Sequence, residues 1–153
     1  MAGYSGTPLP RKLGIKEGHR LALVGAPAGF DATLGALPAA VEVRRRLRGP
    51  VDVAVFFTKR RSDLERRFEA LSRAIEVDGG LWVAWPKRAS GVATDMTEDV
   101  VREVALPAGL VDNKVCAIDE TWSGLRVVWR RELRATEAAR RASKSVSAGA
   151  RVE

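Results

Sequence analysis

Five basic residues that could bind an anion follow two predicted strands. They are Lys59, Arg60, Arg61, Lys87 and Arg88. The strands, at residues 51–58 and 80–86, are almost unbroken apolar runs, a pattern typical of strands buried on both faces of a parallel sheet. The carboxyl ends of such strands meet at one edge of the sheet, where helix N-termini also favour anions. We predict a site there for a phosphate- or carboxylate-bearing small molecule or an acidic protein surface; the alternative is that these cations are only solvated.

Two glycines belong to the same candidate site. Gly25 and Gly29 lie in the loop GAPAGF, which follows a predicted strand at residues 20–25. A glycine-containing loop after the first strand of an α/β sheet is where a nucleotide is expected to lie. However, Pro27 interrupts the glycine spacing and has no amide hydrogen to donate, so the match to a phosphate-binding loop is weak.

A polar turn forms a second candidate contact. Its residues are Asp119, Glu120, Trp122 and Ser123, just before a predicted strand at residues 125–131. An aromatic ring among polar side chains suits a partner or ligand contact, because its large face can bury apolar area. The alternative is that Trp122 packs beneath the hairpin, and the sequence leaves both open.

The sequence identifies no catalytic or metal-binding group. The chain has one histidine, His19, and one cysteine, Cys116, which are too few for a Cys/His zinc site or an internal disulfide. The apolar neighbours of Cys116 predict a small buried side chain rather than a nucleophile. No carboxylate pair or Ser/His/Asp set stands out, so we predict no metal and the catalytic residues stay unknown.

The segment between residues 51 and 86 predicts the central strand–helix–strand unit of the fold. Between its strands, four apolar residues recur at helical spacing: Leu64, Phe68, Leu71 and Ile75. Ser62 and Glu65 predict a capping box at the start of this helix. Further strands are expected at residues 20–25, 41–47, 111–118 and 125–131, and helices at 31–37 and 98–108. We therefore expect an α/β fold: a three-layer Rossmann-like open sheet of about six mostly parallel strands with a C-terminal antiparallel hairpin strand.

Charge is unevenly distributed along the 153 residues. We expect an N-terminal arm with a short helix at 1–18, a Rossmann-like domain at 19–134 and a basic, disordered tail at 135–153. The net charge is +7, of which residues 130–153 contribute +4, seven Lys/Arg against three Asp/Glu. Neither a signal peptide nor an apolar run of membrane-spanning length is visible, which predicts a cytoplasmic protein without a membrane partner.

The basic residues around the predicted strand 41–47 have two interpretations. Glu42, Arg44, Arg46 and Arg48 alternate along the chain, as in an edge strand that charge protects from pairing. Together with the tail, these arginines could also contact phosphate backbones, which makes nucleic acid a candidate partner. We favour the edge-strand interpretation.

Three segments of the chain resemble the domain-of-unknown-function family 3052. They are residues 5–27, 79–103 and 109–126, and the resemblance spans residues 3–131. Its specific motif combines Trp85-Pro86-Lys87 with the segment DETWSG at 119–124. That family has no assigned activity, so the resemblance implies no mechanism.

The order of elements is also similar to that of Rossmann-like methyltransferases. The resemblance implies the strand order 41–47, 20–25, 51–58, 80–86, 125–131, 111–118. Such enzymes hold S-adenosylmethionine with a glycine-rich turn after the first strand and an acidic residue at the end of the second, which binds the ribose. Here the first turn contains Pro27, and the second strand ends in Arg44-Arg45-Arg46, the wrong sign for that role.

Three functional hypotheses follow. The first is a degenerate, non-catalytic Rossmann-like module that binds an anionic small molecule or a protein partner. The second is an S-adenosylmethionine-dependent methyltransferase with an altered cofactor pocket, and the third is a nucleic-acid-associated basic protein. No cofactor is established by the sequence, and whether the protein is an enzyme stays open.

Overall fold

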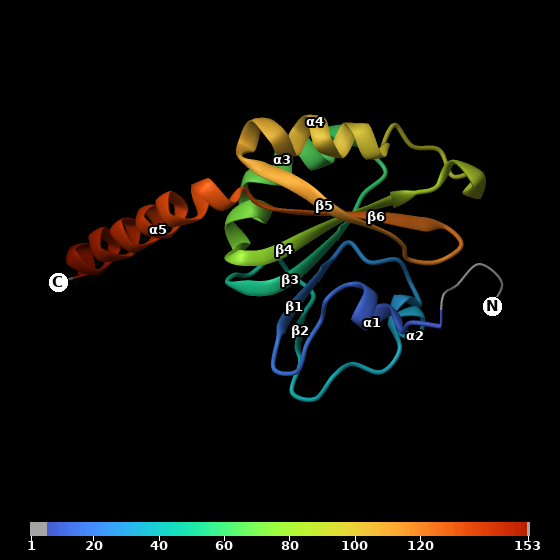
Figure 1. Ribbon diagram of the computed structural model, residues 1–153, viewed down its shortest axis with the longest axis horizontal. Coiled ribbons are helices and arrows are strands. Elements are labelled where there is room, and N and C mark those ends of the chain that lie inside the picture. The colour runs from blue at the N-terminus through green and yellow to red at the C-terminus, as the bar shows by residue number, and fades with distance from the viewer. Residues whose placement is uncertain (1–5, 153) are drawn as a thin grey trace.

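The protein has a six-stranded sheet in the order β2-β1-β3-β4-β6-β5 (Figure 1). A computed structural model describes residues 6–152, with side chains described for 6–144. The strands are β1 (Arg20–Val24), β2 (Glu42–Arg44), β3 (Val51–Phe57), β4 (Ile75–Pro86), β5 (Leu110–Ala117) and β6 (Trp122–Trp129). The first four run parallel, and β6 is antiparallel to both β4 and β5. The predicted fold class and strand order are confirmed.

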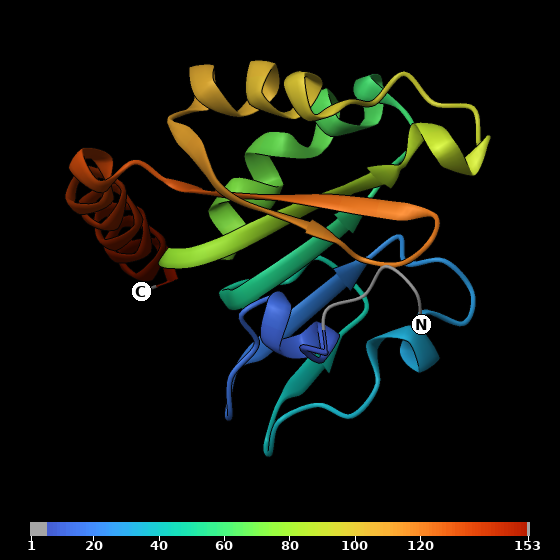
Figure 2. The same cartoon turned by 45° about the vertical axis from the view of Figure 1, so that its right-hand side comes forward.

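Helices and the N-terminal arm cover both faces of this sheet (Figures 1 and 2). The helices are α1 (Leu9–Lys12), α2 (Phe30–Leu34), α3 (Arg61–Ala74), α4 (Glu98–Ala108) and α5 (Arg131–Val152), and Arg88–Ser90 forms a 3-10 turn. One apolar core lies under α3 and α4, and the other lies under the arm and α2. Because side chains alternate along a strand, Trp82 of β4 enters the second core and Trp85 enters the first.

The described part of the N-terminal arm, residues 6–18, packs on one face of the sheet. Leu13 is fully buried, and its carbonyl oxygen accepts a hydrogen bond of 2.9 Å from the indole Nε1 of Trp82. This bond satisfies the one polar group of a tryptophan that is otherwise enclosed by apolar side chains. Leu13 and Ile15 of the arm are therefore part of the core.

Helix α3 begins differently from the sequence prediction. Ser62 lies inside the helix, so the predicted capping box with Glu65 is wrong. The first helical amide, of Arg61, instead donates to the carboxylate of Asp95 at 2.7 Å. Asp95 is distant in sequence and follows β4, so local spacing could not reveal it as the cap.

Strand β2 is shorter than predicted. It ends at Arg44, whose Nη1 donates to the carbonyl oxygens of Arg48 and Pro50 in the following loop. Arg45 turns toward α2 and pairs with Asp31 at 2.9 Å. The alternating charged face that we predicted for residues 41–47 therefore stops at Arg44.

The predicted disordered tail is a helix in the structure, because α5 extends over Arg131–Val152. Glu137 is 3 % exposed and pairs with Arg141 at 2.9 Å. Arg141 also donates to the carbonyl oxygen of Ile75 at 2.8 Å and, more weakly, to that of Ser72. The carbonyl of Ser72 belongs to the last turn of α3, where backbone acceptors lack helical partners and favour positive charge. Arg141 thus anchors the first half of α5 by capping the C-terminal end of α3. Among the described residues, no helix has the length and apolar content to cross a membrane.

Candidate functional site

The chain leaves the carboxyl ends of β1 and β3 toward opposite faces of the sheet. After β1 it enters α2 on one face, and after β3 it enters α3 on the other. Adjacent strands that diverge in this way leave a crevice, which is the usual ligand site of open α/β sheets. A cavity of about 440 Å³ lies there, which we call the switch-point crevice; its lining includes Gly25, Phe57, Thr58, Lys59, Arg60 and Arg67.

A buried threonine shapes the loop at the bottom of the crevice. The Thr58 hydroxyl accepts a hydrogen bond from the Arg60 amide and lies within bonding distance of the Arg60 carbonyl, both at 3.1 Å. The preceding carbonyl, of Lys59, accepts a hydrogen bond of 2.6 Å from the Thr94 hydroxyl. These bonds hold the backbone of the loop while leaving the side chains of Lys59 and Arg60 exposed.

The crevice is positively charged. Neither Lys59 nor Arg60 forms an ion pair within the described part of the chain. Arg67 lies over the ring of Phe56, 5.4 Å from its centroid, which neutralises no charge. Of the four basic side chains in the lining only Arg66 has a carboxylate partner, Asp63 at 2.7 Å. An anionic group would therefore bind here with favourable electrostatics.

The glycine loop forms the other wall of the crevice. Gly25 has φ of +73°, and a Cβ added there would lie 3.0 Å from the carbonyl oxygen of Phe57. Glycine is therefore required both by the backbone conformation and by the close approach of β1 to β3. A second cavity, of about 400 Å³, is lined by this loop, which includes Gly29, and by Asp31 and Arg45.

The second cavity does not fit the ribose of a nucleoside cofactor in the usual way. The acceptor expected after β2 is replaced by Arg44-Arg45-Arg46. The one carboxylate in the lining, Asp31, already binds Arg45 through both of its oxygens, at 2.9 and 3.1 Å. Pro27 also removes one amide that could have bound a phosphate.

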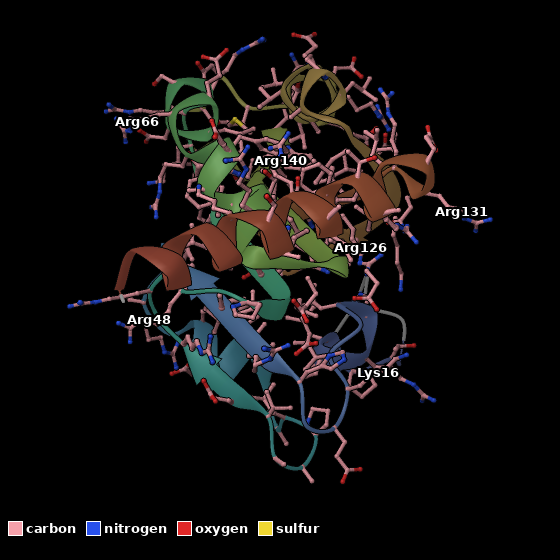
Figure 3. All side chains as sticks on the ribbon, turned by 90° about the vertical axis from the view of Figure 1, so that its left-hand side faces the viewer. Lys16, Arg48, Arg66, Arg126, Arg131 and Arg140 are labelled. Carbon is pink, nitrogen blue, oxygen red and sulfur yellow. The ribbon has the colours of Figure 1, made fainter. Side chains whose placement is uncertain are left out.

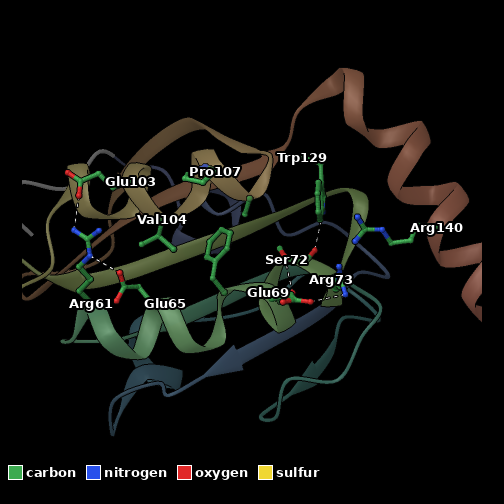
Figure 4. A pocket seen from close by; sticks show the side chains of 12 residues that line it. Arg61, Glu65, Glu69, Ser72, Arg73, Glu103, Val104, Pro107, Trp129 and Arg140 are labelled. Carbon is green, nitrogen blue, oxygen red and sulfur yellow. Dashed lines mark hydrogen bonds and ion pairs between the residues drawn. The ribbon is translucent and has the colours of Figure 1, made fainter.

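Three of the five predicted basic residues lie outside the crevice. Arg61 is paired with Glu65 at 3.1 Å and with Glu103 at 2.7 Å, and its side chain lines a groove of about 550 Å³ between α3 and α4 (Figure 4). Hydrogen bonds from Arg61 to these two carboxylates raise the pKa of Arg61. Lys87 and Arg88 follow β4 but do not line the crevice. Of the predicted cations, the structure brings together only Lys59 and Arg60.

The predicted polar turn has a structural role. The Asp119 carboxylate accepts hydrogen bonds from the amides of Thr121 and Trp122, at 2.8 and 2.7 Å. Trp122 is 8 % exposed and packs edge-on against Phe57, so it is a core residue that also forms a wall of the crevice. Glu120 and Ser123 are not part of the crevice lining.

Sequence reasoning missed Arg67. Arg60 is the N-cap residue of α3 and has an extended backbone, whereas Arg67 lies in the second turn of the helix; both line the crevice. Helical spacing alone does not relate the two residues, because Arg60 precedes the helix.

Cys116 and the metal-ligating side-chain types are the remaining candidates for chemistry. Burial raises the pKa of the Cys116 thiol, despite opposing positive charge from Lys12, Lys114 and Lys87, so the thiol stays protonated and unreactive near neutral pH. Among the described residues, no cluster of three or more His, Cys, Asp or Glu side chains could hold a metal ion.

Solved structures with a similar fold include several methyltransferases. The ribosomal protein L11 methylase of Lactobacillus delbrueckii subsp. bulgaricus matches with a TM-score of 0.55 and 12% identity over 81% of this chain and 76% of that one. A putative type 11 methyltransferase from Sulfolobus solfataricus has a TM-score of 0.56 and 13% identity, over 80% and 89% of the two chains. A SAM-dependent methyltransferase from Aquifex aeolicus has a TM-score of 0.55 and 19% identity, over 76% of this chain and 85% of that one.

At these identities the likeness shows the fold alone. The chain therefore has the Rossmann-like fold that these methyltransferases share. Comparison with protein-family models gave no match, and comparison with curated protein sequences gave none either. The resemblance to family 3052 stays a prediction.

Proposed function

We propose that the protein binds, in the switch-point crevice, a small molecule that carries a phosphate or carboxylate group. The observation that supports this proposal is the meeting of Lys59, Arg60 and Arg67 around one cavity without a carboxylate partner in the described structure. Unpaired cations that surround a concave site attract anions more strongly than the same charges spread over a convex surface.

The side chains, rather than the helix amides, supply this attraction. The N-terminus of α3 opens beside the crevice, but its first amide already donates to Asp95. An anion would therefore be bound mainly by the Lys59 ammonium and the Arg60 and Arg67 guanidinium groups. Arginine can bind a phosphate or carboxylate through two parallel hydrogen bonds.

A second candidate is S-adenosylmethionine-dependent methyl transfer. The structural comparisons favour it more directly than the first: the solved neighbours include magnesium protoporphyrin IX methyltransferase from Synechocystis with bound SAM, at a TM-score of 0.54 and 13% identity over 74% of this chain. Bound in the crevice, this cofactor would supply a methyl group. Lys59 and Arg60 would suit its carboxylate, whereas the arginines after β2 do not suit its ribose hydroxyls.

Calorimetric titration with four ligands separates the two candidates. The ligands are S-adenosylmethionine, S-adenosylhomocysteine, ADP and inorganic phosphate, each at low salt with the full chain. Saturable binding of ADP or phosphate alone supports the anion site. Binding of S-adenosylhomocysteine in preference to ADP supports the methyltransferase, and a methyl-transfer assay would follow. Absence of binding by all four would contradict both.

A matched pair of variants tests where the ligand binds. Lys59→Gln/Arg60→Gln removes two crevice charges and should weaken anion binding about tenfold or more, because a hydrogen bond to a charged group contributes about 1.5–3 kcal/mol. Lys87→Gln/Arg88→Gln makes the same change in net charge outside the crevice and should leave the affinity unchanged. Equal effects of the two variants would contradict the assignment.

A further inference from the structure

Basic side chains gather at the opposite edge of the sheet, where β6 leads into α5, and all of them except Arg140 lack a carboxylate partner among the described residues. Figure 3 looks onto this edge: α5 crosses in front of the sheet, and Arg126, Arg131 and Arg140 lie along it. We define the amino-edge basic face as Arg126, Arg131, Arg134, Arg140 and Lys144. Between residues 131 and 144, five Lys/Arg stand against two Asp/Glu, and one of these two, Glu137, is buried beneath Arg141.

Arg126 is the clearest sign that this face lacks a counter-ion. Its guanidinium lies against Gly80, where a Cβ would be only 2.3 Å from Nε, and it has no hydrogen bond or ion pair with any described residue. Burial lowers the pKa of Arg126, and the positive charge of Arg134 lowers it further. The side chain stays charged because arginine ionises far above neutral pH, so a half-buried charge lies beside a like charge.

The neighbouring arginines keep their charge although some of them are held in place. The Nε of Arg134 donates to the carbonyl oxygen of Trp129 at 3.1 Å, a bond that orients the guanidinium without neutralising it. Arg140 reaches Glu137 only at 3.7 Å, and Glu137 is shared with Arg141. Arg131 and Lys144 are exposed and have no ion pair within the described structure. Apart from Arg140, the face thus presents cations that no carboxylate of the described residues compensates.

We propose that this face and α5 bind the phosphate backbone of a double-stranded nucleic acid. Helix α5 has 22 residues, about 33 Å at 1.5 Å per residue, and its distal half extends away from the sheet (Figures 1 and 2). An α-helix fits the major groove of B-form DNA, where it lies between two rows of phosphates, whereas on a duplex RNA it would contact the phosphates from outside the deep, narrow major groove. Arg140 and Lys144 are one turn apart and lie on the same side of the rod.

The structure disfavours two other polyanionic partners, single-stranded nucleic acid and an anionic membrane. All tryptophans and phenylalanines of the chain are buried, so the described surface offers no aromatic platform on which the bases of a single strand could stack. The described side chains of α5 include a single large apolar residue, Leu133, which is too little to anchor the helix in a bilayer. Backbone contacts to a duplex need neither feature.

The test is fluorescence anisotropy of the full chain with labelled duplex DNA and duplex RNA of about 20 base pairs. We expect binding to at least one duplex that weakens linearly on a log–log plot against salt, with a slope of about −0.9 per phosphate contacted. The variant Arg126→Gln/Arg131→Gln/Lys144→Gln removes three charges, and none of these side chains has a partner that the fold requires. Its slope should be less steep by about 3, since each lost phosphate contact reduces the slope by about 1.

A matched control makes the same change in net charge elsewhere. Arg11→Gln/Lys87→Gln/Arg88→Gln alters three cations outside this face and should keep the wild-type slope. Equal slopes for the two variants would overturn the proposal, as would no binding of either duplex at low salt. Preference for single strands, or binding of anionic vesicles but not of duplexes, would also overturn it. Failure here would leave the crevice proposal intact, because that site lies at the other edge and has its own ligands.

Discussion

The role of each basic side chain depends on whether a carboxylate lies near it. Arg20, at the amino end of β1, donates to Asp52 of β3 at 3.2 Å and reaches Glu76 of β4 at 3.5 Å. The Arg20 amide also donates to Asp52, at 2.7 Å. These bonds join three neighbouring strands, so Arg20 contributes to the fold. Lys59 and Arg126 have no such partner and are available to ligands.

Asp52 should make stability depend on pH. Burial acts to raise the pKa of Asp52, but hydrogen bonds from the Arg20 amide and guanidinium and the charge of Arg20 outweigh it, so the pKa is lowered. A carboxyl whose pKa is lower in the folded state stabilises the protein above its unfolded pKa of about 3.9. That contribution disappears as pH falls through the folded value.

The variant Asp52→Asn should therefore be less stable at pH 7 by about 1–3 kcal/mol, and the difference from wild type should shrink below about pH 4. Urea denaturation of the variant and of the wild type at a series of pH values measures this difference in the free energy of unfolding. Asp99→Asn, at a carboxylate whose side chain is 81% exposed, should show little change. A difference for Asp52→Asn that persists unchanged at low pH would contradict the argument.

Two adjacent glycines should respond differently to the same substitution. A Cβ at Gly79 would lie 2.7 Å from the backbone oxygen of Asp52, whereas the atoms nearest to a Cβ at Gly80 belong to the flexible Arg126 side chain. We expect Gly79→Ala to lower the free energy of unfolding by about 1–3 kcal/mol, the usual cost of overpacking, and Gly80→Ala to cost less. Thermal unfolding of both variants tests this, and the reverse ranking would refute it.

At the scale of elements, helix α5 is stabilised by the hydrogen bonds with which it caps the C-terminal end of α3. Trp129, at the end of β6, donates its indole Nε1 to the Ser72 carbonyl at 3.0 Å, and Arg141 of α5 reaches the same carbonyl and that of Ile75. A tail rich in alanine and serine would bury too little surface to fold by itself. It becomes helical where its arginine meets acceptors that the last turn of α3 leaves free.

Two truncations should separate the capping half of α5 from the rest. Ending the chain after Arg130 removes Glu137 and Arg141 and should lower the melting temperature by several degrees, since about 1 kcal/mol corresponds to roughly 2–4 °C for a chain of this size. Ending it after Lys144 keeps those contacts and should change the melting temperature little. Equal melting temperatures for both truncated chains would show that the capping contacts are dispensable.

At the scale of the whole molecule, two apolar cores share one sheet. Trp85 and Trp129 lie in the core beneath α3 and α4, and Trp82 and Trp122 lie in the core on the other face. Strands β4 and β6 contribute to both cores. Loss of either core would expose the sheet that supports the other, so the molecule should unfold as one cooperative unit.

Two reporter variants test this cooperativity. Trp82→Phe/Trp122→Phe leaves tryptophans in one core only, and Trp85→Phe/Trp129→Phe leaves them in the other. In each variant, the urea transition followed by fluorescence should coincide with the one followed by circular dichroism. Separate midpoints within one variant would mean that the two faces unfold independently.

Most of the fold could be predicted because its signals are local. The apolar runs that became β3 and β4, and the helical spacing of Leu64, Phe68 and Leu71, require only neighbouring residues to be read. The strand order followed from similarity to a known arrangement of such elements. Local signals failed at the two ends of α3, where Asp95 caps one end and Arg141 caps the other, because both partners come from distant parts of the chain.

The sequence by itself determined which segments are buried, and therefore the sheet, the helix that covers its centre and the edge where a ligand site would lie. Only the tertiary structure decided which charges remain free. Arg61 and Lys59 are both basic residues that closely follow β3 in the sequence. In the structure, however, Arg61 of α3 pairs with Glu103 of α4, whereas Lys59 meets no carboxylate among the described residues. The physical reason is range: burial is set by the pattern of each segment, whereas an ion pair forms only where folding brings two distant side chains within about 4 Å.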